Sequence, residues 1–317
     1  MSGKTELSLL EKQGWIEPML RVFLEEHPRL KKAAKQLRNK RAQGESAPAA
    51  APDPAALAAY RQRLDEIIRP GDLVLIHSSM DGLEKLGFSA EDCLAFLKAQ
   101  VETKACTVVM ACFPITNLKL PTEKSRPYDP KKTLCWTGLL PNVFLADPAC
   151  VRSSFPYNSL AAIGPEAENM MARSLEGESV YHPGSPWRYC YERRAKILFL
   201  GVKASVSNTM AIHMVPDLMG AAWPVGDWYE LRQYRVRLDE GVVTVPVRVQ
   251  KDFWYRYTME EGTSGWLKAA GLLTETDFGG CSLGLVPDCR QMLDALIGRC
   301  REGKLMYRIP RKYRKAP

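Results

Sequence analysis

The sequence lacks the patterns that mark several classes of protein. No stretch of its 317 residues approaches the roughly 18 unbroken apolar residues of a membrane-spanning helix. Its nine cysteines include no C-x-x-C pair, which argues against a structural zinc site and against a secreted disulfide framework. P-loop patterns are missing, so no motif points to nucleotide hydrolysis. The N-terminus has no apolar signal-peptide core, and we expect a cytoplasmic protein with reduced thiols and no bound metal.

The middle of the chain has no net positive charge, although the formal net charge of the whole chain is +8. Residues 29–41 hold seven basic and no acidic residues, and residues 299–317 hold eight basic residues and one acidic residue. Residues 42–298 are acidic on balance. A nucleic-acid-binding body carries the basic excess itself, so we expect no specific nucleic-acid partner. The basic ends are predicted to be accessory, either docking to an anionic membrane surface or an acidic partner, or solubilising the chain.

Composition divides the chain into four parts. Residues 1–43 are predicted to be a helical basic N-terminal extension, with helices over 5–24 and 29–41. Residues 44–56 are rich in Ala, Pro and Ser, which is typical of a linker. Residues 57–302 are predicted to form the folded domain, and residues 303–317 form a basic tail.

Hydrophobic patterning within the folded domain predicts alternating strands and helices. The apolar runs 73–77, 107–112 and 197–202 suit buried strands, and residues 233–250 read as a hairpin turning at Asp239–Gly241. Residues 114–137 are expected to be a long surface loop. Helices are expected at 55–68, 89–101, 138–145, 165–175, 207–218 and 287–300. This pattern indicates an α/β fold with a mixed β-sheet flanked by helices.

Seven segments follow one another in an order that a known family shares. They are GDLVLIHSSMDGL (71–83), TVVMACFP (107–114), GLLPNVF (138–144), VRSSFPYNSLAAIGPEA (151–167), HPGSPW (182–187), KILFLGV (196–202) and SNTMAIHMVPDL (207–218). Together they resemble the aminoglycoside 3-N-acetyltransferase family, also called the antibiotic N-acetyltransferase fold, as a divergent member. The resemblance covers roughly residues 60–300. It implies acyl transfer from acetyl-CoA, or another short acyl-CoA, to an amine.

His213 is the candidate general base that the resemblance implies. An ammonium is not a nucleophile, and a histidine backed by a carboxylate can take its proton. The family pattern N-T-x-x-H-x-x-E reads N-T-x-x-x-H here, with Pro216 where the family has Glu. We expect Asp217, four residues after His213, to replace that Glu on the same helical face, although Pro216 can bend the helix. The alternative is a core histidine that bonds a backbone carbonyl.

The family motif R-S-x-H-P departs from its pattern at Phe155, where the family has His. If that His transfers the proton in relatives, this chain is either inactive or uses another base. His182, beside Gly184-Ser185-Pro186, is the reserve candidate. Its alternative is a surface loop histidine.

Six residues match family positions that meet the cofactor. His77, Ser78 and Ser79 end a predicted strand, and ligands of open α/β sheets gather beyond the carboxyl ends of strands. Arg152, Ser153 and Ser159 are the other three, and Arg152 could hold a phosphate. The alternatives are a capped strand-end turn for the serines and a surface ion pair for Arg152.

These observations predict an acyl-CoA-dependent N-acyltransferase that acts on an amino sugar or aminoglycoside. Antibiotic resistance is the family's best-known role. The N-terminal extension and the altered motif favour a biosynthetic role, in a surface polysaccharide or a secondary metabolite. The alternative from another class is a catalytically degenerate member that binds coenzyme A or a partner.

Overall fold

The computed structural model describes residues 52–115 and 126–314. The helices predicted over 5–24 and 29–41, and most of the predicted linker, lie outside these residues. Within the described part, α3 already begins at Pro54, because the Asp53 side chain caps it by accepting a 2.9 Å hydrogen bond from the Ala55 amide. The folded domain therefore starts about three residues earlier than predicted.

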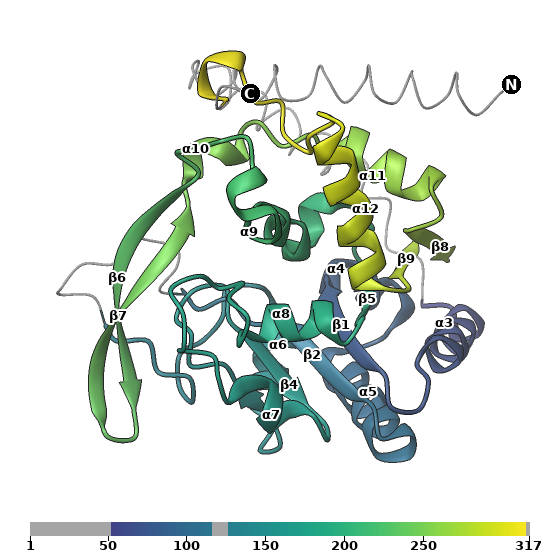
Figure 1. Ribbon diagram of the computed structural model, residues 1–317. Coiled ribbons are helices and arrows are strands. Elements are labelled where there is room, and N and C mark those ends of the chain that lie inside the picture. The colour runs from purple at the N-terminus through teal and green to yellow at the C-terminus, as the bar shows by residue number, and fades with distance from the viewer. Residues whose placement is uncertain (1–51, 116–125, 315–317) are drawn as a thin grey trace, which may run out of the picture.

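A seven-stranded mixed sheet organises the domain, in the order β3-β4-β2-β1-β5-β9-β8. Its strands are β1 (Leu73–Ser78), β2 (Thr107–Ala111), β3 (Val151–Arg152), β4 (Leu160–Ile163), β5 (Lys196–Leu200), β8 (Thr274–Phe278) and β9 (Cys281–Val286). The three central strands β2, β1 and β5 run parallel, and the outer strands pair antiparallel with their neighbours. The carboxyl ends of the central strands therefore meet at one edge of the sheet (Figure 1).

Helices cover both faces of this sheet (Figure 1). The α-helices are α3 (Pro54–Ile67), α4 (Met80–Leu83), α5 (Ala90–Lys104), α6 (Leu139–Leu145), α7 (Ala167–Met171), α8 (Pro186–Glu192), α9 (Val215–Met219), α10 (Asp252–Tyr255), α11 (Glu260–Ala269) and α12 (Cys289–Arg301). Short 3₁₀ turns are η1 (Glu84–Leu86), η3 (Val206–Asn208), η4 (Met210–Met214), η5 (Gly220–Ala222) and η6 (Arg311–Tyr313). One apolar cluster joins the sheet to α3, α5 and α6, and the other joins it to α8, α9 and α12.

A second, two-stranded sheet stands beside the main body. Strands β6 (Tyr229–Leu238) and β7 (Gly241–Gln250) form the predicted hairpin, which is longer than expected at its open end. Its inward side chains, among them Tyr234, Val236 and Val247, are buried, and Tyr234 and Val247 join the cluster that holds α9 and α12. The base of the hairpin thereby reaches the helices beyond the strand ends (Figure 1).

The strands predicted from apolar runs are confirmed as β1, β2 and β5, and together they fill the centre of the sheet. The helices predicted at 55–68, 89–101, 138–145 and 287–300 are also present, as α3, α5, α6 and α12. Ser89 caps α5 as expected, accepting a hydrogen bond from the Asp92 amide. The helix predicted over 165–175 is shorter, as α7.

The prediction of one helix over 207–218 is wrong. The segment is divided between η3, η4 and α9, and α9 begins at Val215. Pro216 lies in the first turn of α9, where a proline is tolerated because its missing N–H has no intrahelical partner. Pro216 thus marks the start of a new helix rather than a bend in a longer one.

The expectation that the tail 303–317 is accessory is wrong for its described part. Met306, Tyr307 and Ile309 are buried in the core. The backbone amide of Met259 donates a 2.8 Å hydrogen bond to the Met306 carbonyl, which ties the tail to the start of α11. These residues belong to the folded domain.

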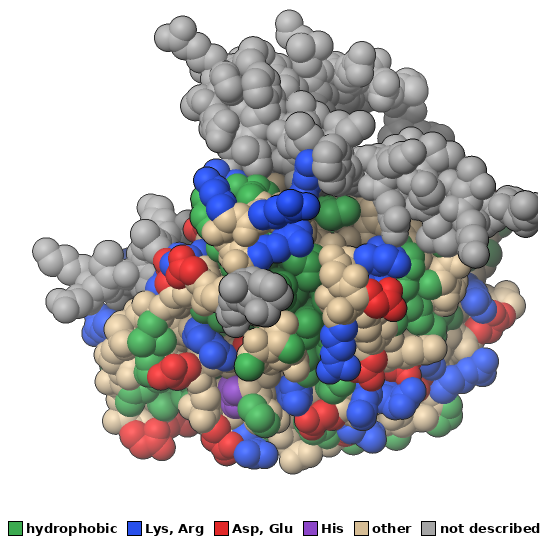
Figure 2. Space-filling view, turned by 45° about the horizontal axis from the view of Figure 1, so that its top comes forward, with side chains coloured by type: hydrophobic (Ala, Val, Ile, Leu, Met, Phe, Trp, Pro, Cys, Tyr) green, Lys and Arg blue, Asp and Glu red, His purple; other side chains and the backbone are tan. Residues whose placement is uncertain are grey.

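The surface of the described residues carries mixed charge on the face shown in Figure 2, where Lys and Arg side chains are interspersed with Asp and Glu. Within residues 52–115 and 126–314, no helix combines the length and apolarity needed to cross a membrane.

Candidate active site

The carboxyl end of β1 carries the first group of predicted site residues. His77, Ser78 and Ser79 are half-buried there, and the His77 ring stacks on Phe199 with 5.6 Å between ring centroids. Burial lowers the pKa of His77 to about 4, so the ring is neutral at physiological pH. Its Nε2 atom is buried without a hydrogen-bond partner among the described residues. This nitrogen is therefore an unsatisfied polar atom beside two half-buried serines at the strand end.

Two glycines let helix α4 approach the backbone at the end of β5. A Cβ added at Gly82 in α4 would lie 2.0 Å from the carbonyl oxygen of Gly201, the residue that follows β5. Gly201 has φ +65°, a conformation that favours glycine. The GDLVLIHSSMDGL and KILFLGV segments thus meet through backbone contact at the edge where the predicted site lies.

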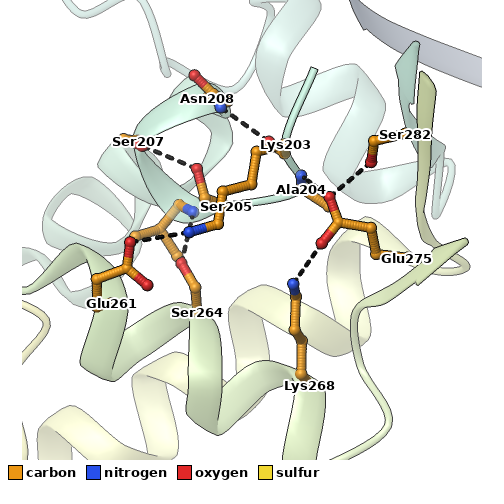
Figure 3. Close-up of polar contacts among 11 residues, drawn as sticks. Lys203, Ala204, Ser205, Ser207, Asn208, Glu261, Ser264, Lys268, Glu275 and Ser282 are labelled. Carbon is orange, nitrogen blue, oxygen red and sulfur yellow. Dashed lines mark hydrogen bonds and ion pairs between the residues drawn. The ribbon is translucent and has the colours of Figure 1, made fainter. Parts of the chain in front are cut away.

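The segment after β5 is fixed by polar contacts from three elements (Figure 3). The Ala204 amide donates a 2.8 Å hydrogen bond to Glu275 of β8, and the Val206 amide donates one of 3.0 Å to Ser264 of α11. Glu275 also accepts a hydrogen bond from Ser282 of β9. These bonds hold the loop in place, and so position η4, which carries His213.

Thr209 begins η4 by accepting a hydrogen bond from the Ala211 amide. His213 lies near the end of η4 and is buried. Its Nδ1 atom is 2.6 Å from the Tyr307 hydroxyl, and its ring contacts the Tyr255 ring edge-on at 5.3 Å between centroids. Burial lowers the pKa of His213 to about 4. His213 is therefore a neutral imidazole in contact with two phenol side chains.

Gln250, the last residue of β7, adds a third polar group beside the imidazole. Its amide is buried, and neither the oxygen nor the nitrogen has a satisfactory hydrogen bond among the described residues. The amide nevertheless lies close enough to raise the pKa of His213 and to lower the pKa of Tyr307. An unpaired buried amide is costly, which makes Gln250 a candidate partner for either group.

Asp217 does not pair with His213, contrary to prediction. One carboxylate oxygen accepts a 2.7 Å hydrogen bond from the Ser179 hydroxyl, and the other lies 3.0 Å from the Arg248 guanidinium. The physical reason is that η4 has about three residues per turn, so the i, i+4 rule of an α-helix does not apply across the junction with α9. In the described part of the chain, no carboxylate forms an ion pair or hydrogen bond with His213.

His182 is held by backbone groups on both ring nitrogens. Its Nε2 atom lies 3.2 Å from the Ser174 carbonyl oxygen, and its Nδ1 accepts a 3.1 Å hydrogen bond from the Gly184 amide. This pairing requires the neutral Nε2–H tautomer. His182 is buried rather than a surface histidine, and its lone pair is already used. Phe155, at the position of the family His, is buried with its ring 6.4 Å from that of His182.

Arg152, Ser153 and Ser159 direct their polar groups to the backbone. Arg152 donates to the carbonyl oxygens of Thr133 and Cys112, the second at 2.6 Å, and Ser159 donates to the same Cys112 oxygen at 3.0 Å. Ser153 accepts a hydrogen bond from the Phe155 amide. These contacts fasten the chain at the end of β2 to β3 and β4. They leave little of the three side chains for a coenzyme phosphate.

A hollow of about 1010 Å³ lies between the end of α6, strand β3 and the tip of the hairpin, and Arg152 lines it. Neither His213 nor Ser78 borders it. Nowhere in residues 52–115 and 126–314 do three or more His, Cys, Asp or Glu side chains gather as a metal site would require.

Sequence reasoning missed Tyr307 and Gln250. Tyr307 is 94 positions from His213 and lies in the tail assigned an accessory role. No periodicity links residues so far apart. The one available signal was Leu-Met-Tyr (305–307), a short apolar run inside a basic tail.

The described residues form an α/β protein with polar side chains at the ends of parallel strands and a buried neutral histidine beyond them. The family model described as aminoglycoside 3-N-acetyltransferase matches residues 75–298. The chain belongs to the aminoglycoside 3-N-acetyltransferase family, as its motifs predicted.

Individual relatives are distant. Aminoglycoside N(3)-acetyltransferase III from Salmonella sp is 26% identical over 171 residues, which cover 49% of this chain and 59% of the relative. The Serratia marcescens protein of the same name is 25% identical over 158 residues, or 46% of this chain and 58% of the relative. The chain thus spans somewhat over half the length of these relatives.

Solved structures share the fold over a larger part of the chain. AAC-IIIb in a binary complex with CoASH has a TM-score of 0.62 at 18% identity, covering 79% of this chain and 98% of that one. The AAC(3)-IVa apoenzyme has a TM-score of 0.62 at 23% identity, covering 80% and 92%. Sisomicin-bound AAC-VIa has a TM-score of 0.63 at 17% identity, covering 78% and 97%. These comparisons establish the predicted fold.

Proposed function

We propose that the chain is an acyl-CoA-dependent N-acyltransferase, which moves an acetyl or other short acyl group to an amine of an amino sugar or aminoglycoside. Family membership supports this proposal. Relatives of the same fold are described in complex with CoASH, sisomicin or apramycin. Coenzyme A and a small-molecule amine are accordingly the proposed ligands.

The observation that carries the proposal is the neutral, buried His213 at the family's His motif. The substrate nitrogen, once neutral, attacks the thioester carbon; the C–N bond forms and the C–S bond breaks. The attacking nitrogen becomes acidic as it forms this bond, so even a weakly basic imidazole can accept its proton. The thiolate of coenzyme A leaves and takes up that proton, which restores neutral His213.

The strand-end groups fit the other half of this reaction. The unpaired Nε2 atom of His77 and the hydroxyls of Ser78 and Ser79 lie where ligands of parallel sheets gather. A donor there could stabilise the negative charge that develops on the thioester oxygen. We therefore propose that the acyl end of the co-substrate lies at this edge.

A second candidate function is a catalytically degenerate protein that binds coenzyme A or a partner. The observations that favour it are specific: Phe155 has no proton-carrying atom at the motif position, and both ring nitrogens of His182 are occupied. His213 is then the remaining candidate base, and turnover is absent if His213 does not accept a proton.

The cellular setting belongs to the proposal as well. A cytoplasmic protein that acylates an amino sugar during the biosynthesis of a surface polysaccharide or secondary metabolite agrees with the altered motif. The basic N-terminal segment 29–41 would then dock to an anionic membrane surface or an acidic partner. Deleting residues 1–46 should leave transfer to a soluble amine intact.

The deciding experiment offers the purified chain acetyl-CoA together with a panel of amines, including aminoglycosides, simple amino sugars and an unrelated primary amine. Product is followed by the mass of the acylated amine, because the nine cysteines of the chain complicate thiol detection. Calorimetry measures coenzyme A binding in parallel. Acylated sugar amine supports the first function. Binding of coenzyme A without any product supports the second. Absence of both contradicts the acyltransferase and leaves, of the second function, only the form that binds a partner.

A further inference from the structure

The tail residue Tyr307 contacts the candidate base directly. Its hydroxyl lies 2.6 Å from Nδ1 of His213, and both side chains are buried. Tyr307 follows the span 75–298 that the family model matches. It stands where a carboxylate is expected behind a catalytic histidine, while Asp217 is engaged by Ser179 and Arg248.

The phenol is held firmly in place. On its two sides, the Met259 amide donates to the Met306 carbonyl and the Arg308 amide donates to the Tyr257 carbonyl, each at 2.8 Å. The ring packs edge-on against Trp228 at 4.8 Å between centroids. Because backbone hydrogen bonds and the Trp228 indole fix the Tyr307 side chain, its hydroxyl can orient the neighbouring His213 ring.

The hydrogen bond between Tyr307 and Nδ1 of His213 can have its protons in two arrangements. Burial lowers the pKa of His213 to about 4 and raises the pKa of Tyr307, so both groups are neutral near pH 7. Either the phenol donates to Nδ1 and Nε2 keeps the ring proton, or Nδ1–H donates to the phenol oxygen and Nε2 has a lone pair. Only the second arrangement gives a base that can accept a proton at Nε2.

The proposed function requires the second arrangement, and Gln250 can complete it. If the phenol oxygen accepts from His213, its own hydrogen needs another acceptor. As placed, the Gln250 side chain lowers the pKa of Tyr307, which is the effect of an amide N–H directed at the phenol oxygen; turning the buried amide over presents its unpaired oxygen to the phenol hydrogen instead. The pairing would also remove the cost of an unsatisfied buried acceptor.

We propose that Tyr307 is a positioning residue that holds His213 as the Nδ1–H tautomer, with Gln250 accepting the phenol hydrogen. This inference rests on the proposed function for its catalytic meaning. During the reaction the amine proton moves to Nε2 of His213, while Nδ1–H stays on the phenol oxygen and the phenol keeps its hydrogen. The proton then passes from Nε2 to the departing thiolate.

The test is nitrogen NMR of the full chain labelled with ¹⁵N at histidine. The chain has only four histidines, and His213→Gln assigns the signal of interest. Neutral tautomers are distinguished by which ring nitrogen resonates as protonated. We expect the Nδ1–H tautomer for His213 and the Nε2–H tautomer for His182. In Tyr307→Phe the His213 signal should lose the Nδ1–H form, while His182 stays unchanged.

Tyr313→Phe is the matched control, since it removes a hydroxyl from the same tail where the ring packs on Phe253 and Trp254. It should leave the His213 tautomer as it is. Gln250→Met provides an independent variant if Tyr307→Phe does not fold, and should convert His213 to the Nε2–H form. An Nε2–H tautomer in the unmodified chain, or no change in either variant, would overturn the proposal.

Turnover gives the second readout. Tyr307→Phe should lower kcat at least about tenfold with KM for both substrates within about twofold, because general-base catalysis contributes roughly 100- to 10,000-fold. Unchanged kcat would contradict the positioning role. The tautomer measurement needs no activity, so failure of the proposed function and failure of this inference are separable.

Discussion

The Ser179 hydroxyl donates a 2.7 Å hydrogen bond to Asp217, and this bond, together with Arg248 at 3.0 Å, holds the carboxylate away from His213. The side chain of Asp217 is 10% exposed, while that of Arg248 is 44% exposed. Asp217 thereby connects α9 to the hairpin strand β7 and to the loop before α8. Its contacts assign it a structural role.

Asp217→Asn should therefore affect stability more than catalysis. The variant loses the ion pair with a half-exposed arginine and weakens one buried hydrogen bond, which together stabilise the fold by about 1 kcal/mol. Urea unfolding should show this loss, and kcat should stay within about twofold. A kcat reduced about 100-fold at unchanged stability would instead restore Asp217 as the partner of the base.

The close approach of Gly82 to Gly201 predicts a sensitive position. Gly82→Ala would place a methyl group 2.0 Å from a backbone oxygen, so α4 or the end of β5 must shift. We expect a loss of about 1–3 kcal/mol in the free energy of unfolding.

Gly298→Ala is the matched control for Gly82→Ala. Gly298 lies within α12 with nothing within 4 Å of an added Cβ, so alanine should stabilise the helix by up to about 1 kcal/mol. Equal effects of the two substitutions on denaturant unfolding would contradict the close contact.

The contacts of Arg152 predict a structural rather than a cofactor-binding role. Arg152→Gln removes donors from the carbonyl oxygens of Thr133 and Cys112, and should cost about 2–3 kcal/mol of stability. The dissociation constant for coenzyme A should change less than about threefold. Calorimetry that shows binding weakened tenfold or more, with stability intact, would support the phosphate contact expected from the sequence.

Burial of His213 and His77 predicts that the fold loses stability in mild acid. Each folded-state pKa, about 4, lies below the ordinary value near 6.5, so the unfolded chain binds more protons between these values. Stability is fully present above pH 6.5 and falls as pH decreases toward 4. The groups facing His213 (Tyr255, Tyr307 and Gln250) do not take up protons in this window.

Denaturant unfolding at pH 7 and pH 5 measures this effect. His213 should account for a loss on the order of 1–3 kcal/mol. His213→Gln removes its share, so the difference between the two pH values should shrink in that variant. The same difference in both proteins would show that His213 does not titrate as its burial requires.

Sequence patterning was most informative where one local rule decides structure. The apolar runs of β1, β2 and β5 are buried on both faces, so their strand character is visible without the rest of the sheet. Strand β8 (Thr274–Phe278) is exposed at the sheet edge and shows no such run, and β3 has two residues. β8 pairs with β9 directly across the Gly279–Gly280 turn and β3 pairs with nearby β4, so each strand is defined by its partner rather than by an apolar run of its own.

The candidate site shows the same difference between local patterns and contacts made by the tertiary fold. Family motifs nominated His77 and His213 as candidates, because each motif is local. The helical spacing that paired His213 with Asp217 failed, since Thr209 and Pro216 divide that segment into a 3₁₀ turn and a new helix. Tyr307 and Gln250 reach His213 only through the tertiary fold, by the docking of the tail and the hairpin.

Acyl transfer by His213→Gln tests the central claim most directly. The variant should bind coenzyme A as the unmodified chain does, and should lose at least about 100-fold in kcat with acetyl-CoA and the preferred sugar amine. His182→Gln, at a histidine whose ring nitrogens are both bonded to backbone, is the comparison. A His213→Gln protein that is folded and retains kcat within about threefold would contradict the account.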